Sequence, residues 1–289
     1  MPSPLLPSAS SPLPALPAPI EPTRSTLQAY SLAVGSIPRR HAIPDRRWWH
    51  VGLTVRPDGL VTEPMTLPDG GACHLRMDLR RHVVVVDPSR LPPGGEPSAT
   101  VPMDAGLTAV GMGDRLLEIV GALGLAPDVD RSRFEDAADA TGYLPAIATG
   151  LFDALVAMSR VFDLRRAELP GDPGPVHLWP HGFDLSFEWF GTRVVAGDEG
   201  DAPAQLNLGF VPTGPAYLYS NPWPFDPGLV DHDLPAGAHW NTEGWQGAVL
   251  PYDEVAGRPD GVERVLAFAR RVFDLAQPTL TADDPRGSP

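Results

Sequence analysis

The chain has 289 residues, 43% of them hydrophobic, and a formal net charge of −14. The hydrophobic fraction is sufficient for a folded core, while the acidic balance argues against a general affinity for nucleic acid or anionic lipid, which both favour a basic face. All 22 basic residues are arginine, and the absence of lysine excludes a Walker A phosphate loop, a pyridoxal-phosphate Schiff base and a lysine aldolase.

The N-terminal segment, residues 1–22, contains eight prolines. It has no positively charged start, and no long apolar run occurs here or elsewhere, so we expect no secretory signal and no membrane-spanning helix. The composition is typical of a disordered arm, either a passive tail or a ligand for a proline-binding partner. We expect one folded domain over 23–276 and a loose tail over 277–289.

The first predicted strand covers residues 48–56, and the turn signal Pro57-Asp58-Gly59 follows it. Residues 60–65 are predicted to return from this turn as a second strand. On an extended strand, Trp48 and His50 share one face and Trp49 takes the other. His50 is therefore either a residue of a site or a buried histidine with a backbone partner.

Two further strands are predicted over 72–79 and 82–86, followed by a helix over 108–123 that ends at Gly124. Cys73, the only cysteine, lies in the first of these strands and is expected to be a buried thiol. A single cysteine excludes an intrachain disulfide and a multi-cysteine metal site. It fits a reduced compartment, so we expect a cytoplasmic location.

A second helix is predicted over 144–166, where apolar residues recur at helical spacing. After it, residues 183–190 alternate. The odd positions are apolar, and the even positions are Asp184, Ser186 and Glu188, which predicts a half-buried strand.

More strands are predicted over 205–211, 216–219 and 247–250, and a last helix over 260–275, where Asp260 and Glu263 have the spacing of a capping box. Strands thus come in runs, which predicts an α+β fold with a mainly antiparallel sheet packed with about three helices. The sequence Arg-Val-Phe-Asp-Leu occurs at 160–164 and again at 271–275. This recurrence indicates two pseudo-repeats of a meander plus a helix, or it is a chance match.

The densest group of chemically active residues is Pro175-Val176-His177-Leu178-Trp179-Pro180-His181-Gly182-Phe183-Asp184. An imidazole oriented by a carboxylate is the minimal equipment for acid–base catalysis, and both groups also bind metals. On an extended strand His177 and His181 lie too far apart to share one metal, although Pro180 and Gly182 permit a kink. The alternative is structural: His177 donates to a backbone carbonyl and Asp184 caps a turn.

Aromatic residues on irregular, proline-rich backbone suit a flat ligand or a sugar face, because rigid rings lose little entropy on ordering. They suit the cover of a sheet edge equally well. The candidate ligand-binding residues are Trp49, Trp179, His181, Tyr219 and Trp223.

Several segments over about 40–275 resemble a bacterial family of uncharacterised proteins, a domain of unknown function. They are Trp48-Trp49-His50-Val51, Gly59-Leu60-x-Thr62, Pro175-Val176-His177, Phe183-Asp184-Leu185, Tyr217-x-Tyr219 with Pro222, and Leu250-Pro251-Tyr252-Asp253-Glu254. His50, His177 and Asp184 fall on signature positions of that family. Where many members have Trp-Gly-Ser, this chain has Pro180-His181-Gly182. The resemblance implies a globular cytosolic protein of one domain and implies no reaction.

The leading hypothesis is an enzyme that acts on a small molecule without an organic cofactor. His177 would be the acid–base residue, Asp184 would orient it, and His50 would be a second proton donor or an oxyanion contact. The alternatives are a non-catalytic protein that binds a small molecule in an aromatic-lined pocket, and a partner-binding protein that uses the proline-rich arm. The sequence leaves the metal content, the cofactor and the oligomeric state open.

Overall fold

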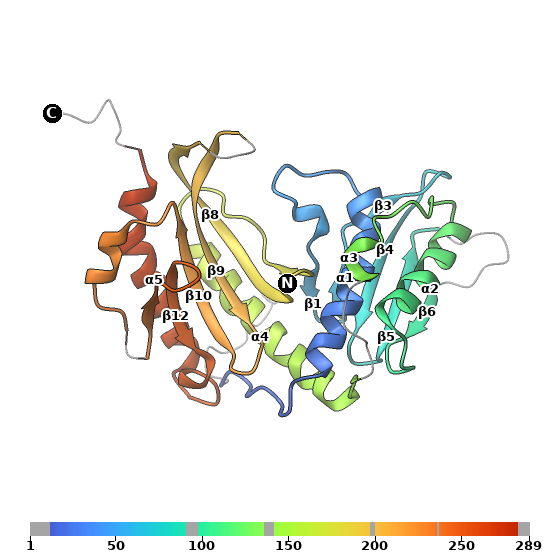
Figure 1. Ribbon diagram of the computed structural model, residues 1–289, viewed down its shortest axis with the longest axis horizontal. Helices are drawn as coiled ribbons and strands as arrows, with labels where there is room; N and C mark the ends of the chain where they lie inside the picture. The colour runs from blue at the N-terminus through green and yellow to red at the C-terminus, as the bar shows by residue number, and fades with distance from the viewer. Residues whose placement is uncertain (1–11, 91–97, 136–141, 197–199, 236, 283–289) are drawn as a thin grey trace, which may run out of the picture.

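Two antiparallel sheets of six strands each form the framework of the part of the chain that the structure describes. That part, in a computed structural model, comprises residues 12–90, 98–135, 142–196, 200–235 and 237–282. The first sheet has the order β1-β2-β4-β5-β6, with β3 paired to β4, and the second has the order β11-β12-β10-β9-β8-β7. Figure 1 shows the second sheet in the left half of the molecule and the first in the right half. The α+β fold expected from the sequence is confirmed.

The first half of the chain contains α1 (Thr23–His41), η1 (Trp49–Val51), β1 (Thr54–Arg56), β2 (Gly59–Val61), β3 (Met65–Thr66), β4 (Ala72–Asp78), β5 (Val83–Pro88), β6 (Ala99–Pro102), α2 (Ala109–Ala122) and α3 (Ser132–Glu135). The second half contains α4 (Pro145–Glu168), β7 (His177–Trp179), β8 (Asp184–Val195), β9 (Ala202–Val211), β10 (Tyr217–Trp223), η2 (Pro227–Asp231), β11 (His239–Asn241), β12 (Gly247–Pro251), η3 (Tyr252–Glu254) and α5 (Gly261–Leu280).

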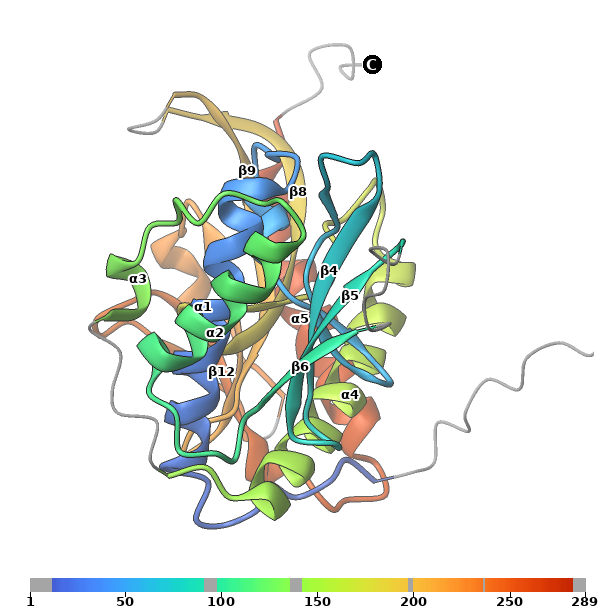
Figure 2. The ribbon, with the colours of Figure 1, turned by 90° about the vertical axis from the view of Figure 1, so that its right-hand side faces the viewer.

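Helices cover both sheets with apolar side chains. In α4, the predicted stripe of Leu151, Leu155, Met158 and Phe162 is fully buried, and each such side chain contributes about 1.5–3 kcal/mol through removal from water. Helices α4 and α5 pack on the second sheet, and α2 packs on β5 and β6. Figure 2 shows α1 and α2 on one side of β4–β6 and α4 on the other.

A short backbone contact joins the two sheets. Leu53, just before β1, exchanges two backbone hydrogen bonds of 2.8 and 2.9 Å with Leu178 in β7. The N-terminal segment also reaches the second half, because the described residues include a buried Leu13 bridged to Ala256, and the Tyr252 hydroxyl donates to the Pro14 carbonyl. The part of the proline-rich segment from residue 12 onward therefore packs against the fold, whereas the sequence favoured a disordered arm over 1–22.

The predicted helix caps can be compared with the ends of α2 and α5 in the structure. The side chain of Thr108 caps α2 by accepting from Gly111 N at 3.1 Å, and Gly124 follows the helix with a positive φ of 92°, as its place after the apolar stripe predicts. The capping box expected for α5 does not form, because Asp260 pairs with Arg264 instead. The same helix runs past Pro278 to Leu280, beyond the predicted end at Leu275.

The segment from Trp48 to Arg56 is the main correction to the predicted elements. Only Thr54–Arg56 is a strand, and Trp49–Val51 forms a turn of 3₁₀-helix instead. Trp48 itself has a left-handed backbone, φ 62°. The apolar and aromatic residues here pack around a bend, and a bend has no two-residue period for the sequence to reveal.

Candidate functional site

One face of the second sheet carries polar side chains at its centre. Two neighbouring cross-strand rows run over β8, β9 and β10, one of Glu188, Asn207 and Asn221, and the next of Ser186, Gly209 and Tyr219. Asp184 lies on the same face, because side chains two and four residues apart point to one side of a strand. The opposite face is mainly apolar, with Ser220 as a buried polar residue, and packs on α4 and α5. The sheet therefore concentrates its polar groups on the side that faces the first half of the molecule.

Asp184 and Tyr219 form the shortest side-chain contact of this face. The Tyr219 hydroxyl donates to Asp184 Oδ2 at 2.6 Å. The ring reaches from β10 across β9 because residue 209 is glycine, and a Cβ at that position would overlap the ring. Burial raises the pKa of Asp184, and the bond from Tyr219 partly opposes the rise. Burial and the Asp184 charge raise the pKa of Tyr219 well above its usual range.

Glu188 is a second carboxyl group on this face. The indole Nε1 of Trp49 donates to Glu188 Oε2 at 3.3 Å. Burial raises the pKa of Glu188, although the Trp49 bond and the charge of Arg47 lower it. Asp184 and Glu188 thus both hold protons more readily than ordinary carboxyl groups, which is common among residues that do chemistry.

The end of α1 and the segment after it form the facing wall. The Arg39 guanidinium lies 4.4 Å from the centre of the Trp48 ring, and the Arg47 guanidinium lies 3.7 Å from the centre of the Phe190 ring. The left-handed backbone of Trp48 costs a non-glycine residue about 1–3 kcal/mol. Strain of this size is often found at functional sites, where surrounding contacts maintain it.

Helix α1 also holds the hairpin that connects β7 to β8. Gln28 Nε2 donates to the His181 carbonyl at 2.6 Å, and Ser31 Oγ lies 3.5 Å from the Pro180 carbonyl. Phe183 has a left-handed backbone, φ 49°, directly before Asp184. The hairpin thereby fixes the start of β8 and the position of the Asp184 carboxyl group.

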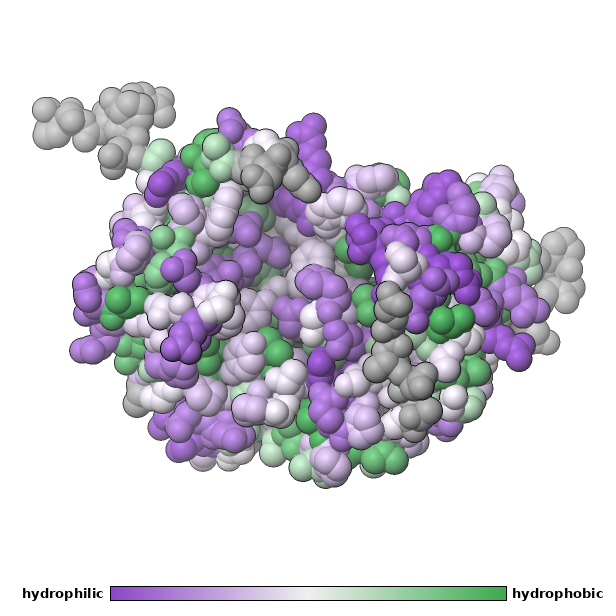
Figure 3. Space-filling model, in the orientation of Figure 1, coloured by the Kyte–Doolittle hydropathy of each residue, from purple (hydrophilic) through white to green (hydrophobic). Residues whose placement is uncertain are grey.

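A cavity of about 560 Å³ lies between the sheet and this wall. Its lining consists of Arg39, Arg47, Trp48, Val51, Trp179, His181, Asp184, Ser186, Glu188, Asn207 and Tyr219. A second cavity of about 260 Å³ shares Asp184 and Tyr219 with it and adds Asn221 and Trp245. Figure 3 shows the surface hollowed between the two halves of the molecule.

Two polar side-chain atoms of this face have no hydrogen-bond partner among the described residues. The Oδ1 atoms of Asn207 and Asn221 are buried and accept no hydrogen bond from the described residues. A buried acceptor without a donor costs about 1–3 kcal/mol. The face therefore has spare capacity to accept hydrogen bonds.

A family model described as "Family of unknown function (DUF5996)" matches residues 13–286. The chain belongs to this family. No curated protein and no solved structure matches the chain. The expected resemblance to an uncharacterised family is confirmed, and the match extends beyond 40–275 at both ends. None of the helices in the described ranges has the length and apolar character needed to cross a membrane.

The structure separates the three predicted catalytic residues. Asp184 lies in the cavity of about 560 Å³, whereas His50 and His177 line a different cavity of about 300 Å³. His177 is buried, and neither of its ring nitrogens has a partner among the described residues. The expected hydrogen bond between His177 and Asp184 does not form. The register of β7 on β8 explains this, because Trp179 lies opposite Asp184, and His177 lies opposite Ser186.

Both histidines of the cavity of about 300 Å³ have lowered pKa values and so resist protonation. Burial lowers the pKa of His177 to about 4, with a further contribution from the charge of Arg166. Burial also lowers the pKa of His50, whose Nδ1 accepts from the backbone N–H of Asp45 at 3.1 Å. These imidazoles are neutral at neutral pH, and they do not assist Asp184 directly.

The predicted ligand-binding residues divide in a similar way. Trp179, His181 and Tyr219 line the cavity over Asp184, and Trp179 Nε1 donates to Ser186 Oγ at 2.9 Å. Trp49 donates a hydrogen bond to Glu188 but lines the cavity of about 300 Å³ that contains His50 and His177. Trp223 ends β10 and lines none of the cavities described above.

Sequence reasoning did not select Glu188, Ser186, Asn207, Arg39 or Arg47 as site residues. The alternation of 183–190 already placed Ser186 and Glu188 on the face of Asp184, and the apolar Leu206 and Leu208 flank Asn207 in the same manner. A comparison of neighbouring strands would have grouped these residues. Arg47 belongs to the run Arg46-Arg47-Trp48-Trp49-His50, in which the sequence pointed to His50 and the tryptophans rather than to the arginine. No local pattern marks Arg39, and the fold alone brings both arginines to the sheet.

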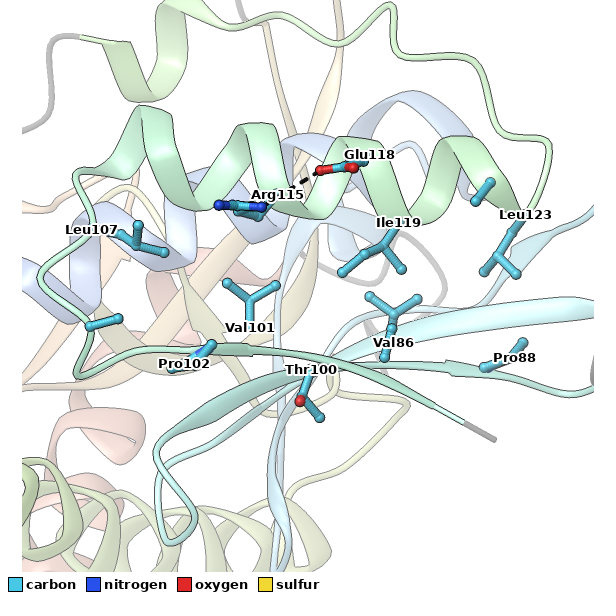
Figure 4. Close-up of a pocket in the computed structure, with 13 residues that line it drawn as sticks. Val86, Pro88, Thr100, Val101, Pro102, Leu107, Arg115, Glu118, Ile119 and Leu123 are labelled. Carbon is cyan, nitrogen blue, oxygen red and sulfur yellow. Dashed lines mark ion pairs between the residues drawn. The ribbon is translucent and has the colours of Figure 1, made fainter. Parts of the chain in front are cut away.

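Other parts of the described structure offer less chemistry. No group of three or more histidine, cysteine, aspartate or glutamate residues among the described ranges has the arrangement of a metal site. A cavity of about 590 Å³ lies between β6 and α2 (Figure 4). Its lining is mainly apolar, with the ion pair of Arg115 and Glu118 at 3.9 Å. The polar cavity over Asp184 is therefore the better candidate for a functional site.

Proposed function

We propose that the protein binds a small molecule rich in hydrogen-bond donors, such as a polyol, a sugar or an amine, in the cavity over Asp184 and Glu188. The observation that carries this proposal is the excess of acceptors on the sheet. Asp184 and Glu188 contribute carboxyl groups, and Asn207 and Asn221 contribute buried oxygens without donors among the described residues. A ligand with several O–H or N–H groups would hydrogen-bond the two carboxyl groups, and a small shift of the amide side chains would bring their closed-off oxygens into the same network.

The remaining lining supports this class of ligand. The ring of Trp179 lies beside Asp184 on the neighbouring strand and lines the cavity, whereas the Trp48 ring on the facing wall is already stacked with Arg39 and His50. Indole rings provide flat contact area for the C–H face of a sugar or for an amine cation at low entropic cost. A volume of about 560 Å³ falls within the range usual for small-molecule sites.

Binding is tested by calorimetry with glycerol, D-glucose and ethanolamine as probes. We expect at least one of them to bind the wild-type protein, and we expect a roughly tenfold weaker affinity in Glu188→Gln and Asn207→Leu, the loss of about one hydrogen bond. Glu243→Gln, at an exposed position, is the matched control. If no probe binds, or if the control variant weakens binding equally, the proposal is wrong.

A second candidate function is acid–base catalysis on the bound molecule, with Asp184 as the proton acceptor and donor. The contact of 2.6 Å with Tyr219 and the raised pKa of Asp184 favour it. A carboxyl group works best as a general acid or base when its pKa approaches the working pH, and burial moves Asp184 in that direction. The donor Tyr219 would fix the carboxyl orientation and leave Oδ1 as the reactive atom.

Catalysis is tested by incubating the purified protein with a mixture of small metabolites and following their conversion by mass spectrometry. We expect Asp184→Asn to abolish a conversion that the wild-type protein performs and to retain binding of the compound. Conversion by Asp184→Asn at the wild-type rate, or no conversion by the wild-type protein, would reject catalysis by Asp184 and leave the binding proposal in place.

A further inference from the structure

We infer that the ligand of this cavity also carries an anionic group, a carboxylate or a phosphate, which Arg39 and Arg47 bind from the wall opposite Asp184 and Glu188. This inference rests on the proposed binding function and narrows its ligand to a molecule with hydrogen-bond donors at one end and an anion at the other. Two observations carry it: how the two guanidinium groups are held, and which partners they have.

Both guanidinium groups are held by aromatic rings. Arg39 stacks on Trp48 at 4.4 Å, and Arg47 lies 3.7 Å from the centre of Phe190 and 5.0 Å from that of Trp49. A guanidinium group has its N–H donors at its edge, so stacking occupies its face and leaves those donors for another group. Trp48 on the wall and Phe190 in β8 of the sheet thus orient the two guanidinium groups at little entropic cost.

Neither arginine forms an ion pair within the described ranges, although the charge of Asp130 acts on Arg39 and the charge of Arg47 acts on Glu188. Most arginines there form an ion pair, for example Arg40 with Asp128, Arg76 with Asp78 and Arg270 with Glu168. Arg39 and Arg47 form no ion pair and no side-chain hydrogen bond with the described residues, although both line the cavity. Other described arginines also lack an ion pair, but Arg39 and Arg47 are two such cations at one cavity, and this placement indicates a site for an external anion.

The two walls together define the polarity of the ligand. The sheet offers carboxyl and amide oxygens, which require donors, and the facing wall offers guanidinium donors, which require an acceptor. An uncharged polyol would satisfy only the sheet, and a simple anion would satisfy only the arginines. A hydroxy acid, an amino acid or a sugar phosphate would satisfy both.

The test uses simple anions first. We expect inorganic phosphate or acetate to bind the wild-type protein weakly, in the millimolar range, and Arg39→Gln and Arg47→Gln each to weaken that binding about fivefold to tenfold. Arg46→Gln is the matched control, since Arg46 is the exposed neighbour of Arg47 and does not line the cavity. Phosphate and acetate form the two arms that distinguish a phosphate ligand from a carboxylate ligand. If neither anion binds, or if the control loses binding equally, the inference is wrong.

Matched pairs of compounds then test the two-ended ligand. D-glucose 6-phosphate is compared with D-glucose, and L-serine with 2-amino-1,3-propanediol, in which a hydroxymethyl group replaces the carboxylate. We expect the anionic member of at least one pair to bind about tenfold tighter to the wild-type protein and to lose this preference in Arg47→Gln. If both members bind equally and Glu188→Gln weakens both, the anion site is refuted and the proposed binding function stands. If no member binds, both fail.

Discussion

Carboxyl groups of the first sheet form ion pairs with arginine, whereas the two central carboxyl groups of the second sheet form none with the described residues. In the first sheet, Arg76 lies among three aspartates, with distances of 3.0 Å to Asp78, 3.4 Å to Asp87 and 3.6 Å to Asp58. In the second sheet, Asp184 has a tyrosine as its side-chain partner and Glu188 has a tryptophan, and neither forms an ion pair with a described residue.

This difference separates structural charges from charges that are free for a ligand. Asp78 is satisfied by Arg76 and by the backbone N–H groups of Arg80 and Arg81, so it needs nothing more. Asp184 and Glu188 keep raised pKa values because burial disfavours their charge and no arginine within the described ranges pairs with them. Carboxyl groups in this state reduce stability, and proteins commonly retain them where a function uses them.

The largest expected effect concerns the paired carboxyl group of the first sheet. Asp78→Ala removes the partner of a mostly buried arginine and two turn hydrogen bonds, so we expect a loss of about 3–5 kcal/mol in the free energy of unfolding. Asp58→Ala, which removes an exposed carboxyl group from the same arginine, should cost less than about 1 kcal/mol. Urea unfolding measures both. Equal losses would contradict the assignment of Asp78 as the structural partner.

The next largest effect concerns His177, whose contribution to the free energy of unfolding falls as the pH is lowered. Its pKa of about 4 in the folded protein is below the 6.5 of a free histidine. The unfolded chain therefore binds more protons between these values, and the folded protein loses up to about 3 kcal/mol as the pH falls from 6.5 to 4.

His177→Leu removes this titration, so its unfolding free energy should change less over that pH window. His232→Leu, at an exposed histidine, is the matched control. Urea unfolding at half-unit steps of pH supplies the data. A wild-type slope retained in His177→Leu would show that another group titrates.

The sequence predicted helices and strands correctly where the pattern depends only on residues close together in the chain. The stripe of α4, the caps of α2 and the alternation of 183–190 depend on neighbours within a few residues, and each identified its element. Helix α1 was not predicted, because it is buried on most of its surface and so lacks a clear polar stripe.

The site was harder to predict from the sequence, because its contacts join residues of different strands and segments. Asp184 and Tyr219 were both selected from local chemistry, but their partnership depends on Gly209 in the strand between them. His177 was paired with Asp184 because they are close in the chain, and the β7–β8 register places Trp179 there instead. Arg39 and Arg47 reach the cavity through contacts between segments far apart in the chain, which one sequence does not encode locally.

A medium effect is expected at Gly209, which permits the contact between Tyr219 and Asp184. Gly209→Ala places a methyl group against the Tyr219 ring, and overpacking of this kind costs about 1–3 kcal/mol. In the background of Tyr219→Ala the same substitution should cost much less, because the ring is absent. A double-mutant cycle by urea unfolding measures this coupling. Independent effects of the two substitutions would contradict the packing of the ring over Gly209.

The smallest effect should come from Asp184→Asn, and its pH dependence is more informative than its size. Because burial raises the pKa of Asp184 in the folded protein above 3.8, the folded state binds more protons than the unfolded chain just above that pH. Wild-type stability therefore falls as the pH rises through the folded pKa. The amide of the Asp184→Asn variant does not titrate, so at neutral pH this variant should be as stable as the wild type or more stable by about 1 kcal/mol. The difference should vanish on acidification.

Glu168→Gln should change the stability at neutral pH in the opposite direction to Asp184→Asn, and it represents the ion-paired kind of carboxyl group. Arg270 lowers the pKa of Glu168, and the charge of this carboxylate therefore stabilises the fold above pH 4.5. Thermal and urea unfolding over the acid-to-neutral range compare Glu168→Gln with Asp184→Asn. If Asp184→Asn destabilises the protein at neutral pH as Glu168→Gln does, Asp184 is a structural charge like Asp78, and the contrast between the sheets does not hold.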